Sequence, residues 1–573
     1  MPCRSANELT MVVLVAVIVV AASCLPYLAG YLFTPPDRVF GGFVLDEIDS
    51  NTYLALMQQG ARGQWTATLL YTPEDHPPIV LYVFYLALGH LAAWLGLPLI
   101  LVYHAARVLC GFLLLVSLYL FGALFIQSRR GRRVAFLLAA VGSGIGWLVA
   151  LATASVAPGG VSPIDFWLME TYVFFTLLLF PHSALAMALL MGMLGSLAVG
   201  FAGVAGPRAW LAAVVCGLLV ALLNPYVLVA SGAILAGYWL SLWLARRRFP
   251  WREAATLVAL GGLLAPAVAL YALQFNAHPV WLSFLGQNIM PSPTMWYYVG
   301  GYGILFALAL PGAWRVLRGR NERQTLLVAW PVTALLVSYA PFAGQRRMAF
   351  GAVIPLAALA AIGLQEVILP AVRRSHIVAQ LDARAYRRDR CEGLLIAMVV
   401  AFASLSNLVL IAGATLSAAS GQAPLSQSAA VEEAIAWLGH HSPQDAVILS
   451  SFRVGNVIPA RIGRRVVWGH WAQTAFYDQK MADVAAFFAT DGPDSGQQAI
   501  LARYDVAYLL YGPAERALGA FDPARAAYLE EVYRKADVAV YRVTAEASVV
   551  GEENEPGLRN CGTQSACLRK GEG

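Results

Sequence analysis

The chain has 573 residues, of which 59% are hydrophobic and 13% are charged, and its formal net charge is +6. A soluble domain carries about 25% charged residues, so this composition excludes an ordinary soluble protein. Repeated apolar runs of about 20 residues indicate a polytopic α-helical membrane protein instead. The positive charge is no evidence for a nucleic-acid partner, because the arginines stand in short clusters between apolar runs, as membrane-orientation signals do.

The first apolar run starts at Met11, after a single arginine at Arg4, and continues to about residue 33. A signal peptide can begin in this way, but the run is long enough to span a bilayer, which favours an uncleaved first helix. We predict eleven spans, at residues 10–33, 98–127, 134–156, 183–203, 209–223, 226–245, 254–273, 298–316, 325–342, 349–370 and 393–416.

Arginine clusters between these spans predict the orientation. They lie within residues 129–133, 246–252, 315–323 and 373–390, all on one side of the membrane if the eleven spans cross. The positive-inside rule makes that side cytoplasmic. We therefore expect a multi-pass plasma-membrane protein with a cytoplasmic N-terminus and an extracytoplasmic C-terminal region. Residues 78–96 also resemble a span, but counting them would put the first arginine cluster outside, so we predict an amphipathic helix on the outer membrane surface.

The composition changes near residue 417, where the polar stretch GQAPLSQS predicts a linker. Predicted helices at 431–438 and 482–488 alternate with predicted strands at 446–450, 465–468, 506–511 and 538–542, which indicates a small α/β domain. The expected organisation is a membrane domain over 1–416 with a long first outer loop at 34–97, an extracytoplasmic α/β domain over 417–545 and a disordered tail over 546–573. Cys561 and Cys567 in that tail could pair in an oxidising compartment.

Three carboxylates stand close together in the first outer loop. Asp46, Glu47 and Asp49 begin a predicted helix that ends near residue 60. Capping of the helix N-terminus explains one of these acids well, because carboxylates suit the positive end of the helix dipole. It does not explain three acids beside a bilayer, where charge is costly and needs partners. The cluster therefore predicts a functional site, with Asp46 its central member.

Two further outer-loop motifs combine acids with histidine. Glu74, Asp75 and His76 precede a Pro-Pro pair, and Asp165-Phe-Trp-Leu-Met-Glu170 precedes a histidine at the mouth of the next span, His182. Carboxylate and imidazole suit a divalent metal such as Mg²⁺, Mn²⁺ or Zn²⁺, or a phosphate relay. Asp75, Asp165 and His182 are the predicted metal ligands. The alternatives are a solvated turn for the first motif and, for the second, capping and a histidine satisfied at the membrane edge.

Arg346 and Arg347 depart from the positive-inside pattern, because they lie at the outer end of a hairpin. Arginine forks match phosphate oxygens, so this pair predicts a phosphate or pyrophosphate site, with His76 as a further candidate. Pairing with outer-loop carboxylates or with lipid headgroups is the alternative.

These motifs together resemble those of the GT-C superfamily of membrane glycosyltransferases. The shared features are LDEIDSNTY (residues 45–53) in a long first outer loop, EDHPP (74–78) before a surface helix, DFWLME (165–170) after the third span and a C-terminal soluble domain. The spacing of the first motif, residues 58–65 and the Pro-Pro turn looks like the aminoarabinose- and mannosyltransferase-like branch. The family often has lysine where His76 stands. The soluble domain has no WWDYG-type run, which argues against an oligosaccharyltransferase.

The resemblance implies an enzyme that moves a hexosyl or pentosyl group from a polyprenyl-phosphate donor to a lipid, glycan or protein acceptor on the extracytoplasmic face, with inversion. Asp46 would activate the acceptor, and Glu47 or Asp49 would support it. Asp75, His76 and Asp165 would bind metal or donor phosphate, and the arginine pair would hold the lipid phosphate.

Two other classes remain open: a transporter or flippase of lipid-linked or anionic substrates, and a non-catalytic assembly or sensor protein. Transporters usually show repeated halves and mid-membrane charges. No repeat is visible here, and the charges lie in loops.

Overall fold

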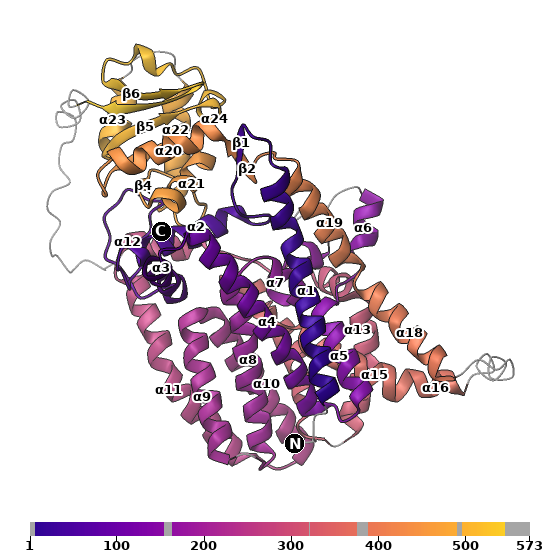
Figure 1. Cartoon of the computed structure of the whole chain (residues 1–573). Coiled ribbons are helices and arrows are strands. Elements are labelled where there is room, and N and C mark those ends of the chain that lie inside the picture. The colour runs from indigo at the N-terminus through magenta and orange to yellow at the C-terminus, as the bar shows by residue number, and fades with distance from the viewer. Residues whose placement is uncertain are drawn as a thin grey trace, which may run out of the picture. The chain divides into compact units, whose positions relative to one another are not determined.

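The computed structural model describes residues 6–153, 163–204, 206–319, 321–374, 388–489 and 495–544. The chain divides into two compact units. The first, which we call the helical unit, comprises Met1–Thr68 and His76–Ala429 (Figure 1). The second, the α/β unit, comprises Leu69–Asp75 and the chain from Ala430 onward. The predicted tail and its two cysteines lie outside the described residues.

Long apolar helices make up most of the helical unit. Within the described residues, nine are long and apolar enough to cross a membrane, or ten if the pair α18–α19, bent by 43°, forms one span. The main helices are α1 (Ala6–Phe33), α4 (Leu99–Phe125), α5 (Arg129–Val141), α8 (Pro181–Phe201), α9 (Gly206–Leu223), α10 (Pro225–Arg246), α11 (Trp251–Asn276), α13 (Met295–Arg318), α15 (Val353–Gly363), α18 (Arg388–Ala403) and α19 (Leu405–Ala419).

The predicted span at 325–342 differs from the others, because its helix α14 (Thr325–Val337) has only 13 residues and contains Pro331. Its first residue contacts the late part of α10, where the hydroxyls of Thr325 and Ser241 are 2.9 Å apart. The turn after α14 reaches the start of α10, where the Tyr226 ring leaves no room for a side chain at Gly344. The segment from Thr325 to Gly344 therefore runs antiparallel to α10 from near its end to its start, although its helical part has only 13 residues.

Helices α2 (Glu47–Ala61) and α3 (Val83–Leu95) pack against each other beside this bundle. Their backbones touch at two glycines: a Cβ on Gly60 would lie 2.0 Å from the Leu86 carbonyl oxygen, and one on Gly89 would lie 2.1 Å from that of Met57. Helix α3 has 13 residues and, like α14, is a short apolar helix, and Trp94 near its end is 81% exposed.

Shorter elements connect the long helices. They are α6 (Gly146–Thr153), α7 (Val173–Leu178), α12 (Pro279–Gln287), α16 (Leu369–Arg373), the 3₁₀ turns η1 (Ile164–Phe166), η2 (Met169–Thr171) and η3 (Gln345–Ala349), and a π-helical stretch η4 (Leu364–Ile368). The predicted linker after residue 417 proved to be partly ordered. Strand β2 (Ser426–Ser428) pairs antiparallel with β1 (Arg38–Phe40), so this segment belongs to the helical unit, and our boundary at 417 lies about a dozen residues early.

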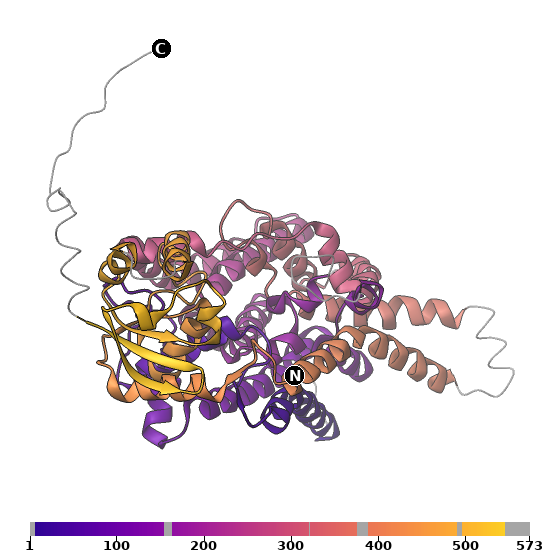
Figure 2. The same cartoon turned by 90° about the horizontal axis from the view of Figure 1, so that it is seen from above.

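The α/β unit contains a mixed five-stranded sheet with the order β4-β3-β5-β7-β6. Its last strands are drawn in yellow in Figure 2. The strands are β3 (Val447–Leu449), β4 (Arg465–Val466), β5 (Val506–Tyr511), β6 (Leu529–Lys535) and β7 (Val538–Val543). The helices are α20 (Ala429–His441), α21 (Phe452–Ile462), α22 (Tyr477–Ala489), α23 (Ser495–Arg503) and α24 (Pro513–Arg516), with a 3₁₀ turn at η5 (Pro523–Arg525). All four predicted strands and both predicted helices are present. The core of the unit lies between sheet and helices, around Leu449, Phe487 and Leu509.

Leu69–Asp75 lies within the predicted first outer loop but belongs to the α/β unit. Its residues hydrogen-bond to Asn456, Val466, Ala475 and Lys480 of that unit. The predicted loop at 34–97 is therefore divided between the two units, because these hydrogen bonds join Leu69–Asp75 to the α/β unit.

Candidate functional site

A cavity of about 280 Å³ lies in the helical unit, where the first outer loop meets the ends of several long helices. Its lining carries three carboxylates, an imidazole and two guanidinium groups among many aromatic rings. The polar lining residues are Asp46, Asp49, Glu170, His182, Ser183, Asn224, Asn288, Arg346 and Arg347, and the aromatic ones include Tyr53, Tyr82, Trp167, Phe180 and Tyr226. The structure thus places four of our predicted residues from the first acidic cluster and the arginine pair, together with His182, around one space.

Asp46 precedes α2 at the N-cap position but does not cap the helix. Its backbone is left-handed, with φ 46° and ψ 52°, and its side chain forms no capping hydrogen bond. Aspartate tolerates this conformation better than most residues, and such backbone strain occurs most often at functional sites. The carboxylate lines the cavity instead. Capping, the simpler explanation of this acid, therefore does not account for it.

The pKa of Asp46 is raised well above its ordinary value. Its side chain is accessible from the cavity yet surrounded by protein, and this desolvation is the largest cause. The charges of Asp49, Glu47 and Glu170 act in the same direction, because each favours the neutral acid. Asp49 lines the cavity with Asp46, whereas Glu47 is not part of the lining. Because of this position, Asp49 rather than Glu47 is the acid that can support Asp46 in the cavity.

The cationic side of the cavity comes from η3, where Arg346 and Arg347 follow the turn after α14. The Arg347 guanidinium lies 4.4 Å from the ring centre of Tyr226, and that of Arg346 lies 5.6 Å from the ring centre of Trp167. The buried Arg346 Nε has no hydrogen-bond partner. Among the described residues, neither guanidinium forms an ion pair, and the outer-loop carboxylate of Glu170 lines the same cavity.

His182 is held at the start of α8 by two hydroxyl groups. Its Nδ1 lies 2.7 Å from the Tyr85 hydroxyl, and its Nε2 lies 3.3 Å from Ser183 Oγ. The Tyr53 ring stacks on that of Tyr85 at 4.2 Å and lies 5.1 Å from the imidazole. Both ring nitrogens are therefore engaged with protein groups, which fits a positioning role better than metal ligation.

The break between α7 and α8 brings Phe180 and His182 to the cavity, because Pro181 starts the new helix. The last carbonyls before the break need partners. They accept hydrogen bonds from side chains of α1 and α4: Leu177 from Arg107 at 2.7 Å, Leu178 from Tyr27, and Leu179 from Tyr103 at 3.0 Å.

Asp165 does not line the cavity. It is buried in η1, where its Oδ2 accepts hydrogen bonds from the amides of Gly144 at 3.0 Å and Gly146 at 3.1 Å. Burial raises its pKa to about 6 against the effect of these bonds. Asp165 thus holds the turn before α6. Glu170, at the other end of the same motif, is the acid that faces the cavity.

Asp75 and His76 also lie outside the lining. Asp75 belongs to the α/β unit and pairs with Arg465 at 2.6 Å, and the His76 ring contacts Trp281 in the helical unit at 5.4 Å between ring centres. Within the described ranges, no three His, Cys, Asp or Glu side chains are grouped so as to hold a metal ion. The structure therefore does not bring the predicted ligands Asp75, Asp165 and His182 together.

Sequence reasoning missed Glu170, Tyr53, Tyr82 and Asn224 as lining residues. Glu170 was visible as the second acid of DFWLME, and Tyr53 as the last residue of LDEIDSNTY. Asn224 had a weaker signal, its position before Pro225 between two apolar runs.

Comparison with known proteins gives similar structures only. No protein-family model and no curated protein matches the chain. An oligosaccharyltransferase from Archaeoglobus fulgidus, solved with a tethered acceptor peptide, superposes with a TM-score of 0.54 at 16% identity over 89% of this chain and 69% of that one. ArnT from Cupriavidus metallidurans bound to undecaprenyl phosphate gives 0.54 at 13% identity over 95% and 99%.

The arabinofuranosyltransferase AftD from Mycobacteria gives a TM-score of 0.51 at 16% identity over 92% of this chain, which spans 40% of the length of that protein. All three are membrane glycosyltransferases of one superfamily. The chain is therefore a multi-pass membrane protein with the GT-C fold and a C-terminal α/β unit.

Proposed function

We propose that the protein is a membrane glycosyltransferase that moves a sugar from a polyprenyl-phosphate donor to an acceptor hydroxyl in this cavity. The observation that carries the proposal is the composition of the cavity wall. The carboxylates of Asp46 and Asp49 and the guanidinium groups of Arg346 and Arg347 line the same space.

The two kinds of group suit the two halves of the reaction. The acceptor hydroxyl must lose a proton as it attacks the anomeric carbon, and a carboxylate can take that proton. The bond between the anomeric carbon and the phosphate oxygen breaks, and the departing lipid phosphate gains negative charge that guanidinium groups stabilise. We assign the first task to Asp46 and the second to the arginine pair. Attack opposite the leaving phosphate inverts the anomeric centre.

The rest of the wall supports a lipid-linked donor. Leu222, Leu223, Val227, Val229 and Leu285 make an apolar surface in the same cavity, suited to a polyprenyl chain. ArnT was solved with undecaprenyl phosphate, and an archaeal oligosaccharyltransferase of TM-score 0.50 with dolichol phosphate. The match to nearly the full length of ArnT favours the aminoarabinose-like branch, with a hexosyl or pentosyl donor and a lipid, glycan or protein acceptor on the extracytoplasmic face.

The decisive variant is Asp46→Asn, with Glu47→Gln as its matched control. Both replace one carboxylate by an amide, but only Asp46 lines the cavity. Purified protein in lipid nanodiscs is supplied with a panel of undecaprenyl-phosphate-linked hexoses and pentoses, and release of undecaprenyl phosphate is measured. We expect roughly a 100-fold or greater loss of release for Asp46→Asn, typical of removing a general base, and near wild-type release for Glu47→Gln. Equal activity of the two variants would refute the assignment.

A divalent metal also remains part of the proposal. The described residues contain no group of three metal-ligating side chains. The cation would therefore depend on the cavity carboxylates and on the donor phosphate itself, as Mg²⁺ often does. We therefore expect EDTA to reduce transfer and Mg²⁺ or Mn²⁺ to restore it. Full activity in excess chelator would remove the metal and leave Arg346 and Arg347 as the cations for the leaving phosphate.

A further inference from the structure

Leu69–Asp75, which we call the clasp, leaves the helical unit and returns to it within seven residues. The chain on either side is closed by a two-bond bridge in the helical unit: the Ala67 amide donates to the Ile79 carbonyl at 2.8 Å, and the Ile79 amide donates to the Ala67 carbonyl at 3.1 Å. The clasp is thus a short loop closed by this bridge, which we call the neck. The tip of the loop is residues 72–74, and it is held by contacts within the α/β unit.

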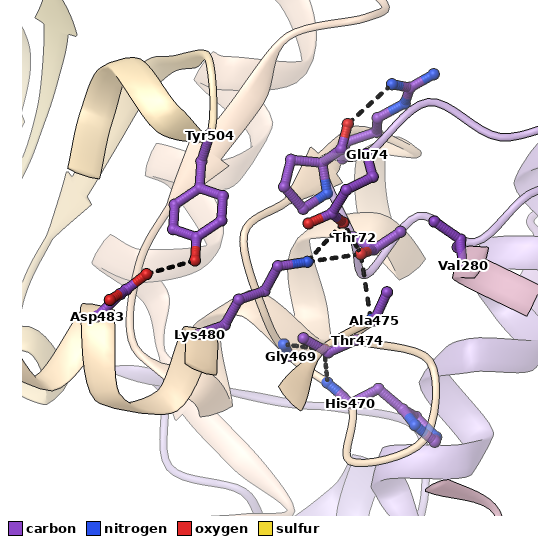
Figure 3. Close-up of polar contacts among 12 residues, drawn as sticks. Thr72, Glu74, Val280, Gly469, His470, Thr474, Ala475, Lys480, Asp483 and Tyr504 are labelled. Carbon is purple, nitrogen blue, oxygen red and sulfur yellow. Dashed lines mark hydrogen bonds and ion pairs between the residues drawn. The ribbon is translucent and has the colours of Figure 1, made fainter. Parts of the chain in front are cut away.

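The tip is held by a buried lysine of α22. Lys480 is 1% exposed, and its Nζ donates to Thr72 Oγ1 at 2.7 Å and to Glu74 Oε2 at 2.6 Å (Figure 3). Thr72 Oγ1 also accepts a hydrogen bond from the Ala475 amide at 3.2 Å and donates one to Glu74. Burial lowers the pKa of Lys480 to about 8, and Glu74 opposes that shift. The ammonium group of Lys480 is therefore hydrogen-bonded to two residues of the clasp, Thr72 and Glu74.

The rest of the clasp follows the edge of the sheet. The Leu70 carbonyl accepts from the Val466 amide in edge strand β4 at 3.0 Å. The Tyr71 hydroxyl donates to the Asn456 carbonyl at 3.1 Å, and Arg465 donates to the Asp75 carboxylate at 2.6 Å. These hydrogen bonds, like those of Thr72 and Glu74, join the clasp to residues of the α/β unit.

Beyond the neck, the chain reaches the cavity within two residues. Leu81 and Tyr82 line it, and Tyr82 has a left-handed backbone with φ 55°. The neck itself is fixed to α2 by Gln59, whose side chain accepts from the Thr68 amide at 2.9 Å and donates to the Thr68 carbonyl at 3.0 Å. On the other side, the Val80 amide donates to Gln274 Oε1 at 2.7 Å.

We propose that the clasp is the element through which the α/β unit positions the Leu81–Tyr82 wall of the cavity, and that Lys480 is a positioning residue for that wall. The structural argument is that the clasp is hydrogen-bonded to the α/β unit. The segments before and after it are hydrogen-bonded to α2 and α11, which line the cavity in the helical unit. The effect expected on catalysis rests on the proposed function, but the position of the wall can be measured without it.

The test compares Lys480→Met with Arg461→Met in the full-length protein in nanodiscs. Arg461 pairs with Glu432 at 3.2 Å between α20 and α21, so its loss is a matched removal of an ion pair in the same unit. Hydrogen–deuterium exchange is measured over residues 69–85. We expect Lys480→Met to raise exchange several-fold at the clasp and at residues 79–83, and Arg461→Met to leave both at the wild-type rate.

Transfer kinetics give a second readout. Displacement of one wall should lower kcat of Lys480→Met about tenfold, because a misplaced wall disturbs the reacting geometry, while Arg461→Met keeps wild-type kcat. Glu74→Gln should reproduce the exchange pattern, and the double variant Lys480→Met/Glu74→Gln should be no worse than either single one, since the two residues act as one contact.

The proposal is overturned if Lys480→Met lowers the thermal midpoint of the protein but leaves exchange at residues 79–83 unchanged, because the lysine then only stabilises the α/β unit. Should Lys480→Met fail to fold, Glu74→Gln decides by the same exchange measurement, with Glu432→Gln as its control. A wild-type protein without transferase activity would refute the proposed function and leave the exchange result, and hence the clasp, to be judged separately.

Discussion

Asp46 owes its chemical character to its neighbours as much as to its position. A carboxyl group that is desolvated and faces the charges of Asp49 and Glu170 holds its proton to higher pH than an aspartate in water. A general base with a pKa nearer the working pH transfers a proton more effectively than one with an ordinary pKa. The acidic neighbours therefore tune Asp46 as a base.

This tuning predicts the pH dependence of transfer. Only ionised Asp46 can accept the proton, so activity should fall as the pH drops through its raised pKa, which places the acid limb at a higher pH than an ordinary aspartate would give. Asp49→Asn removes the negative charge with the largest effect on Asp46, so it should lower the pKa of Asp46 and shift the acid limb to lower pH. The measurement is the pH profile of kcat/KM for both proteins between pH 4 and 8. If the acid limb of the kcat/KM profile lies at the same pH for Asp49→Asn as for the wild type, Asp46 is not the titrating base.

The sequence predicted some of this site and could not predict the rest. Asp46 and the arginine pair were recognisable because charge at a membrane edge has few structural explanations. The choice between Asp165 and Glu170 was not available, because it depends on how two successive 3₁₀ turns direct side chains five residues apart. The hydroxyl that holds His182 comes from Tyr85, 97 residues earlier, so local spacing gave no sign of it.

Helices α2 and α3 show how an element keeps the site in shape. They approach so closely at Gly60 and Gly89 that carbonyl oxygens of the partner helix occupy the space of a side chain. Glycine weakens a helix interior by up to about 1 kcal/mol relative to alanine, so its use here is explained by the contact and not by helix stability. The contact fixes α2, which carries Asp49 and Tyr53 into the cavity.

Gly60→Ala should therefore be destabilising and inactivating. The new Cβ would lie 2.0 Å from the Leu86 oxygen, a backbone atom that cannot move without displacing α3. Overpacking of this kind costs about 1–3 kcal/mol. Gly262→Ala in α11 is the control, because nothing lies within 4 Å of its position, and alanine there should leave stability equal or raise it by up to about 1 kcal/mol. Thermal midpoints in nanodiscs check both variants; a midpoint for Gly60→Ala at or above that of Gly262→Ala would contradict the close packing.

Strands and helices were predicted correctly where the hydrophobic pattern and the length of the segment indicate the same kind of element. Strand β5 was predicted with both its boundaries, because VAYLLY is a short apolar run flanked by polar residues. Strand β6 was missed, since LEEVYRK lies at the sheet edge with four of its seven side chains exposed and has no apolar alternation. Helix α21 was missed because Gly455 and Pro459 interrupt its sequence, although Ser451 caps it through the Val454 amide.

At the scale of the whole chain, orientation depends on the short helix α14. If residues 325–342 cross, the number of crossings is odd and all four arginine clusters share one side. If they do not, everything after Arg323 changes side, and the cluster that begins at Arg373 would face outward against the positive-inside rule. The antiparallel course of α14 along α10 favours a crossing, as does the position of Arg347 in the same cavity as Asp46.

Cysteine labelling can decide this question. After replacement of the native cysteines by alanine, single cysteines are introduced at four half-buried or exposed positions: Gln127, Asn321, Phe342 and Gln422. With a membrane-impermeant thiol reagent on intact cells, we expect labelling at positions 342 and 422 only, and labelling at 127 and 321 only after permeabilisation. Labelling of 321 and 342 from the same side would show that α14 does not cross. The arginine pair would then follow a segment that stays on the cytoplasmic side, which would contradict the placement of its cavity at the extracytoplasmic face.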